Sequence, residues 1–131
     1  MGTLHFKELI VYQLAEKLAD AVWQLAAGWA AFEKDTLGRQ LVRAVDSVGA
    51  NIAEGSGRGT YQDNRRFVLY ARGSLYETQH FLRQAYRRQL IPAHISDVLK
   101  PLMDELPPRL NAYLASIGKT SPKPPLSTSD Q

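Results

Sequence analysis

The chain has 131 residues, and its sixteen Lys and Arg against thirteen Asp and Glu leave a formal charge of only +3. This length is typical of one domain, and a composition of 44% hydrophobic and 22% charged residues excludes wholesale disorder. The lack of cysteine excludes a disulfide scaffold and a thiolate metal site, and no stretch approaches the roughly 20 apolar residues that span a bilayer.

The first residues carry no targeting pattern, because Met1 to Lys7 lacks the basic-then-apolar order of a signal peptide. We therefore expect a cytoplasmic protein with no membrane partner. The first apolar-periodic stretch predicts a helix from about Glu8 to Ala27, which Gly28 closes. The residues expected to face the core are Val11, Leu14, Leu18, Ala21, Val22 and Leu25.

Three aromatic residues near the end of this helix, Trp23, Trp29 and Phe32, raise the question of membrane contact. The polar face of the helix is acidic and neutral, whereas a helix that lies on a membrane is typically basic. We therefore expect these aromatic side chains in the core or at a subunit interface.

A second helix is predicted from about Asp35 to Glu54, and the glycine-rich run at residues 55–59 stops it. The glycine run fits neither the dinucleotide-binding nor the P-loop pattern, so we interpret it as a turn between helices. A single phosphate held at the start of the next helix, with help from Arg58, is the alternative. The expected core face of the second helix is Leu37, Leu41, Ala44, Val45, Val48 and Ile52.

Glu54 stands at the C-terminus of this helix, where its charge opposes the helix dipole. A compensating cation is expected, either Arg58, four residues on, or Arg72 in the next helix. With Asn51 one turn earlier, we interpret Glu54 as part of a structural network that fixes the turn. A binding or catalytic carboxylate is the alternative.

The longest predicted helix runs from about Tyr61 to Gln89, with Thr60 as its N-cap. Gly73 lies inside this helix, where a glycine costs roughly 1 kcal/mol relative to alanine. Because the second helix also carries small residues, Gly73 predicts a close approach of the two backbones. The expected core stripe is Phe67, Ala71, Ser74, Leu75, Thr78, Phe81, Leu82 and Ala85.

The opposite face of the longest helix gathers arginine and tyrosine within roughly 80° of helix surface. Its residues are Tyr61, Arg65, Arg72, Tyr76, Gln79, Arg83 and Arg87. Arginine binds phosphate through paired hydrogen bonds and stacks on rings, and tyrosine stacks on unpaired bases. Residues 34–90 hold ten basic and five acidic residues, which also favours a polyanionic partner.

These observations predict a nucleic-acid-binding set from two helices and the turn between them. Its members are Arg39, Arg43, Arg58, Arg65, Arg72, Arg83, Arg87, Tyr61 and Tyr76. Pairing of the arginines with acidic residues or with a neighbouring subunit is one alternative, and plain solvation of a charged helix face is another.

A fourth helix is predicted from about Ala93 to Ile117, but Pro101, Pro107 and Pro108 fall inside it. We expect a kink or break near Pro107, with a separate short helix from Arg109 to Ile117. Residues 118–131 hold three prolines and one apolar residue, which predicts a disordered tail. Four amphipathic helices with short connections predict an all-α protein, with an antiparallel up-down four-helix bundle over residues 1–117.

The sequence offers no catalytic constellation. Glu77 and His80 form a Glu-x-x-His pair, but a di-iron bundle needs two such pairs and two more inward carboxylates. Because no nucleophile–base pair and no ligand set emerges, we expect no catalytic residue, no metal, no cofactor and no enzymatic activity.

Two runs of sequence are distinctive: ANIAEGSGR at residues 50–58 and ARGSLYE at residues 71–77. With FKEL at residues 6–9, they resemble the bacterial four-helix-bundle proteins encoded in intervening sequences of 23S ribosomal RNA genes. The resemblance covers roughly residues 5–91 and marks no residue as catalytic. Its signature residues in this chain are Asn51, Glu54, Gly55, Gly73, Ser74 and Glu77.

The resemblance implies an antiparallel four-helix bundle that assembles as a ring-like homopentamer. It extends to the accessory variability determinant of diversity-generating retroelements, a basic barrel that binds a reverse transcriptase and nucleic acid. The chain departs from the family pattern at Gly49, where a bulkier residue is common, and in its proline-containing last helix.

We therefore expect a non-catalytic oligomeric module that binds RNA or DNA through its arginine-rich helix face. The alternative is a protein-interaction scaffold, in which the same face docks an acidic patch of a partner enzyme or a neighbouring subunit without nucleic acid.

Overall fold

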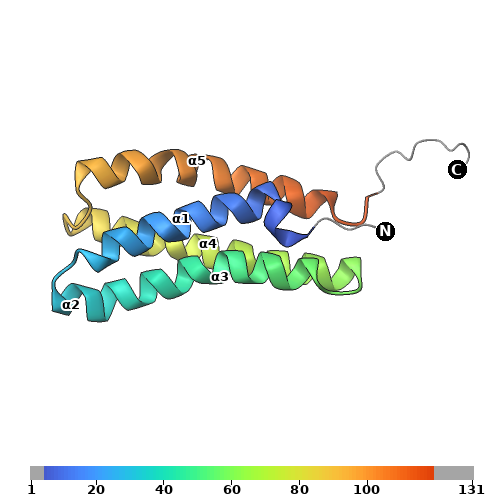
Figure 1. Ribbon diagram of the computed structural model, residues 1–131, viewed down its shortest axis with the longest axis horizontal. Helices are drawn as coiled ribbons and strands as arrows, with labels where there is room; N and C mark the ends of the chain where they lie inside the picture. The colour runs from blue at the N-terminus through green and yellow to red at the C-terminus, as the bar shows by residue number, and fades with distance from the viewer. Residues whose placement is uncertain (1–4, 120–131) are drawn as a thin grey trace, which may run out of the picture.

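Four long helices form an antiparallel bundle in the computed structural model, which describes residues 5–119 (Figure 1). They are α1 (Ile10–Ala27), α3 (Arg39–Ser56), α4 (Tyr61–Arg87) and α5 (Ala93–Ser116). The described residues contain no strand, so the prediction of an all-α four-helix bundle is confirmed. Each long helix packs against two others, in the order α1, α3, α4, α5 around the bundle. Every helix between residues 5 and 119 is too short or too polar to cross a bilayer.

The first helix differs from its prediction only at the start. A short 3-10 turn, η1 (Phe6–Glu8), comes first, and α1 begins at Ile10 after the extended Leu9. Gly28 is the C-cap of α1, as predicted. Five of the six expected core residues are buried, and Ala21 is half-buried.

The second helix starts earlier than predicted and contains an irregular turn. The short α2 (Ala31–Glu33) and the π-helix η2 (Lys34–Gly38) run directly into α3. A Cβ on Gly38 would lie 3.3 Å from the carbonyl oxygen of Glu33 and 3.5 Å from the Trp29 ring. Glycine therefore lets the wide turn pack closely on the end of α1.

The longest helix is capped as predicted, because the Thr60 hydroxyl accepts a hydrogen bond from the Asp63 amide at 3.1 Å. It ends at Arg87, two residues before the predicted end. Its buried residues include Val68, which the predicted stripe omitted. Three members of the predicted stripe are only half-buried: Phe67, Ser74 and Phe81.

The last helix is continuous from Ala93 to Ser116, so the expected break near Pro107 is wrong. The separate short helix expected from Arg109 is also wrong, because Arg109 lies within the same helix. Of the tail predicted for residues 118–131, Gly118 and Lys119 are described, and the remainder lies outside the described residues.

Two of the three prolines of α5 face water. Pro101 and Pro108 are exposed, and so are Asp97 and Asp104, whose carbonyl groups lose their amide donors to these prolines. Exposed carbonyls bond to water instead. Pro107 is half-buried, as is Met103, whose carbonyl loses its donor in the same way. The opposite side of the helix is anchored by three buried residues, Leu99, Leu106 and Leu110.

The expected tight packing of the second and third long helices is present, but not where it was predicted. A Cβ on Gly55 would lie 2.6 Å from Asn64 Oδ1 and 3.0 Å from the Cβ of Phe67. Gly73 is exposed, and a Cβ there would meet no atom within 4 Å. The backbone approach predicted at Gly73 is therefore wrong, and Gly55 is the residue that permits it.

The three aromatic residues near the end of α1 have different surroundings. Trp23 and Phe32 are 60% and 74% exposed, so a place in the core is wrong for both. Trp29 is half-buried, and its Nε1 donates a hydrogen bond to the carbonyl oxygen of Leu90 at 2.8 Å. That bond joins the end of α1 to the connection between α4 and α5.

Candidate nucleic-acid interface

The residues predicted to bind nucleic acid divide into those held by contacts within the bundle and those left open. Arg58 belongs to the first group. Its Nη1 lies 3.1 Å from Glu54 Oε2, its Nε lies 3.7 Å from Asp63 Oδ2, and its guanidinium stands over the Phe67 ring. Arg58, and not Arg72, is thus the cation that compensates Glu54. These contacts favour the structural interpretation of Glu54, although Asn51 bonds to the carbonyl oxygen of Ser47 and not to the turn.

Arg65 and Arg72 also contact the bundle, because both reach across to α5. Arg65 Nη1 donates to the carbonyl oxygen of Ile117 at 2.9 Å, at the C-terminus of α5, where a cation is favoured by the helix dipole. Arg72 Nη1 donates to Asn111 Oδ1 at 3.2 Å. The face predicted as one solvent-facing stripe is therefore partly a contact between α4 and α5.

The second half of α4 keeps its predicted side chains free. Arg83 is exposed, and Arg87 is exposed with one hydrogen bond to Gln84 Oε1 at 3.3 Å. Tyr76 and Tyr61 are 51% and 67% exposed. These side chains form what we call the α4 surface: Tyr76, Arg83 and Arg87, with Tyr61 nearer the start of the helix.

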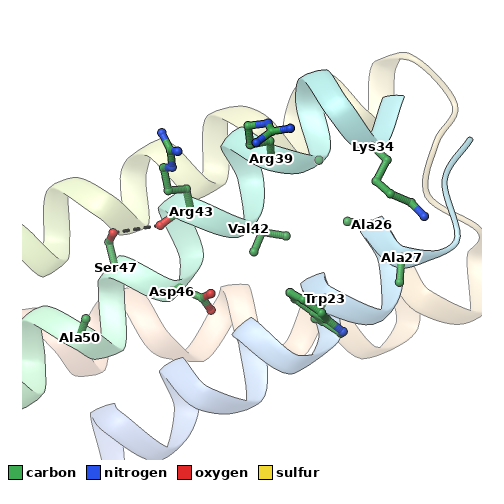
Figure 2. Close-up of a pocket in the computed structure, with 11 residues that line it drawn as sticks. Trp23, Ala26, Ala27, Lys34, Arg39, Val42, Arg43, Asp46, Ser47 and Ala50 are labelled. Carbon is green, nitrogen blue, oxygen red and sulfur yellow. Dashed lines mark hydrogen bonds between the residues drawn. The ribbon is translucent and has the colours of Figure 1, made fainter. Parts of the chain in front are cut away.

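Arg39 and Arg43 lie elsewhere, on α3, where they line a cavity of about 610 Å³ between α3 and α1 (Figure 2). Lys34 from η2 and Trp23 from α1 line the same cavity. We call this space the α1–α3 groove. The structure therefore places the predicted cations on two surfaces.

Lys34 and Trp23 were missed as site residues by sequence reasoning. Trp23 falls three residues after Asp20 on the polar side of α1, and an aromatic side chain on a polar face is a signal that could have marked it. No comparable signal marked Lys34, because its place in the groove depends on the π-turn.

Asp46 is the acidic residue of the groove. Burial raises the pKa of its carboxyl group, and the charge of Asp20 on α1 raises this pKa further. An acidic group held near another acid favours a hydrogen-bond donor or a cation as its neighbour.

The family-signature residues have mostly structural contacts. Asn51 Nδ2 donates to the carbonyl oxygen of Ser47 at 2.8 Å, and the Ser74 carbonyl accepts from the buried Thr78 hydroxyl at 2.8 Å. Glu77 is exposed and has no ion-pair partner within residues 5–119. In that part of the chain, no group of three or more His, Asp or Glu is placed to hold a metal ion.

Gly49 has a local explanation in the structure. A Cβ at this position would lie 3.4 Å from the ring of Tyr12. The missing side chain thus leaves room for the tyrosine ring between α1 and α3, and a bulky residue would displace it.

One comparison with known proteins finds a match, which extends over most of the chain. No curated protein matches the chain closely enough to count as a relative. A family model described as 23S rRNA-intervening sequence protein matches residues 7–112, which include all four long helices up to the last turn of α5. The chain therefore belongs to the family of 23S rRNA-intervening sequence proteins.

Proposed function

We propose that this protein is a non-catalytic module that binds RNA or DNA in the cytoplasm through arginines that the bundle leaves unpaired. One observation carries the proposal. Ion pairs within residues 5–119 engage Arg58, Arg66 and Arg109, and the other seven arginines have no carboxylate within 4.0 Å there. Unpaired arginines supply charge-assisted hydrogen bonds to phosphate.

The distribution of acidic residues strengthens the case for α4. Glu77 is the one acidic residue between positions 64 and 96, and six arginines lie in the same interval. Tyr76 adds an exposed ring for stacking on an unpaired base. The contacts of Arg65 and Arg72 with α5 make the second half of α4 the better binding surface.

We extend the proposal to a homo-oligomer, with five copies as the family resemblance implies. Repetition of the chain multiplies a modest charge into one that attracts a polyanion. The resemblance to the accessory variability determinant, which binds nucleic acid and a reverse transcriptase, supports the same activity. Light scattering is expected to give five times the mass of one chain, and a monomer would contradict this part.

The test is fluorescence anisotropy of labelled single-stranded RNA, double-stranded RNA and DNA across a salt series. The double variant Arg83→Glu with Arg87→Glu is expected to weaken binding, and the slope of log affinity against log salt should fall by about 1 per lost phosphate contact. Lys17→Glu with Lys100→Glu is the matched control, because it changes the formal charge equally on α1 and α5.

An equal loss of affinity in both variants, or an affinity that does not change with salt, would overturn the proposal. If no nucleic acid binds, and a purified partner enzyme binds to wild type but not to the α4 variant, the scaffold alternative takes its place.

A further inference from the structure

The α1–α3 groove combines features that the bundle itself does not need. Small residues leave its volume open, with Ala26 and Ala27 on the α1 side and Gly38 and Ala50 on the α3 side. The π-turn at Lys34–Gly38 leads into one end of the groove, and π-turns inside helices occur frequently at functional sites. A volume of about 610 Å³ falls in the range of small-molecule sites.

The side chains around this space are chemically diverse. Trp23 presents an indole that is 60% exposed, across the groove from Val42 and Asp46 (Figure 2). Lys34, Arg39 and Arg43 stand along the same groove, and none of them forms an ion pair in the described part of the chain. The groove thus offers a stacking surface, a hydrogen-bond acceptor and three cations without a carboxylate partner in the described residues, of which Arg39 also donates to the carbonyl oxygen of Asp35 at 3.4 Å.

The chemistry of these side chains indicates which kind of ligand the groove binds. A flat aromatic ring stacks on Trp23, an exocyclic amino group donates to Asp46, and a phosphate bonds to the lysine and arginines. A fatty acyl chain would leave Asp46 unpaired, and an acidic peptide would not use the indole face as a ring does. A base that carries a phosphate satisfies all three requirements.

We propose that the α1–α3 groove binds one nucleotide, with its base against Trp23 and its phosphate held by Lys34, Arg39 and Arg43. This deepens the proposed function, on which it rests when the nucleotide belongs to a strand. A free mononucleotide has the same chemistry, so the experiment includes both sources.

The experiment follows tryptophan fluorescence during titration with AMP, with adenosine and with a short single-stranded oligoadenylate. Trp23→Phe leaves Trp29 as the emitter, so the difference from wild type reports on the groove. AMP is expected to quench Trp23, and adenosine, which lacks the phosphate, is expected to bind about tenfold or more weakly.

Two variants of equal charge separate the surfaces. Arg39→Gln with Arg43→Gln is expected to weaken AMP binding by about tenfold or more, because two charge-assisted bonds are lost. Lys17→Gln with Lys100→Gln lowers the formal charge by the same amount on α1 and α5 outside the groove and is expected to leave AMP binding unchanged. Far-UV circular dichroism checks that both variants remain folded.

Each outcome decides one of the two proposals. Quenching by both AMP and oligoadenylate supports a groove that takes a nucleotide of a strand. Quenching by AMP while no nucleic acid binds supports a free-nucleotide site and removes the proposed function. Salt-dependent RNA binding without quenching by either ligand overturns the groove proposal alone. Absence of quenching together with a changed oligomer mass in Trp23→Ala overturns it too, and assigns the groove to a subunit contact.

Discussion

Two glycines on neighbouring helices illustrate how the surroundings decide the role of a residue. Gly55 faces the backbone oxygen and the amide side chain of Asn64, whereas Gly73 faces open space. Gly55→Ala is expected to lower the free energy of unfolding by about 1–3 kcal/mol, because the added methyl overpacks the contact with α4. Gly73→Ala is expected to raise it by roughly 1 kcal/mol, because alanine favours an exposed helix interior. Urea unfolding measures both.

The two substitutions serve as controls for each other, since both add one methyl group to a helix. A neutral Gly55→Ala would show that Asn64 and Phe67 move aside without cost. A destabilising Gly73→Ala would show that a neighbouring copy of the chain packs on α4 at that point.

Asp46 gives a prediction about pH. The pKa of its carboxyl in the folded chain lies above the ordinary value of 3.8, through burial and then through Asp20. The folded chain therefore binds the proton of Asp46 more tightly than the unfolded chain does. The stability that this proton contributes is fully present below pH 3.8 and is lost as the pH rises through the folded-state pKa. Asp46→Asn is expected to be more stable than wild type at neutral pH and equal to it in acid.

The measurement is the urea midpoint of both proteins over a pH series. A wild type that is more stable than Asp46→Asn at neutral pH would contradict a raised pKa of this carboxyl.

At the scale of an element, α5 shows that prolines need not end a helix whose apolar side is anchored in the core. Pro101→Ala restores an amide donor for the Asp97 carbonyl and is expected to raise the free energy of unfolding by about 1–3 kcal/mol. Pro92→Ala is the matched control, because Pro92 is the N-cap of α5 and breaks no helical hydrogen bond. Equal changes of Tm in the Pro101→Ala and Pro92→Ala variants would contradict this account.

The helices themselves were predictable, because apolar spacing and capping residues are local signals. Thr60 and Gly28 marked ends that the structure reproduces. The continuity of α5 was not predictable in this way, since it depends on which side of the bundle Leu99, Leu106 and Leu110 face. The π-turn at Lys34–Gly38 could not be predicted from the sequence either. Packing around this turn, and not a local sequence signal, makes it wider than a turn of α-helix.

At the scale of the whole molecule, a hydrogen bond between distant segments lies at each end of the bundle. The connection between α4 and α5 is at one end, and the C-terminus of α5 is at the other (Figure 1). Trp29 bonds to Leu90 at one end, and Arg65 bonds to Ile117 at the other. Trp29→Phe is expected to speed hydrogen exchange in the connection between α4 and α5, and to leave the far end protected. Arg65→Met is expected to do the reverse. Equal changes in hydrogen exchange along the whole chain would contradict the view that the two hydrogen bonds stabilise the two ends independently.

The candidate site could be predicted only in part from the sequence, because the sequence does not show how the helices pack on one another. Helical projection placed Arg83 and Arg87 correctly on an exposed face. It also placed Arg65 and Arg72 there, because a projection of one helix contains no information about the helix beside it. Arg39 and Arg43 were selected by charge, but their shared groove with Trp23 needed the packing of α1 on α3.

The π-turn makes the chain sensitive to length in one short segment. Such a turn holds one residue more than an α-helical turn, so loss of a single residue from Lys34–Gly38 converts it to regular helix. The apolar register of α3 survives this loss, while the groove beside it changes shape. Among relatives, the number of residues between the end of α1 and Leu41 should therefore separate chains that have the groove from chains that lack it, whatever their residue identities.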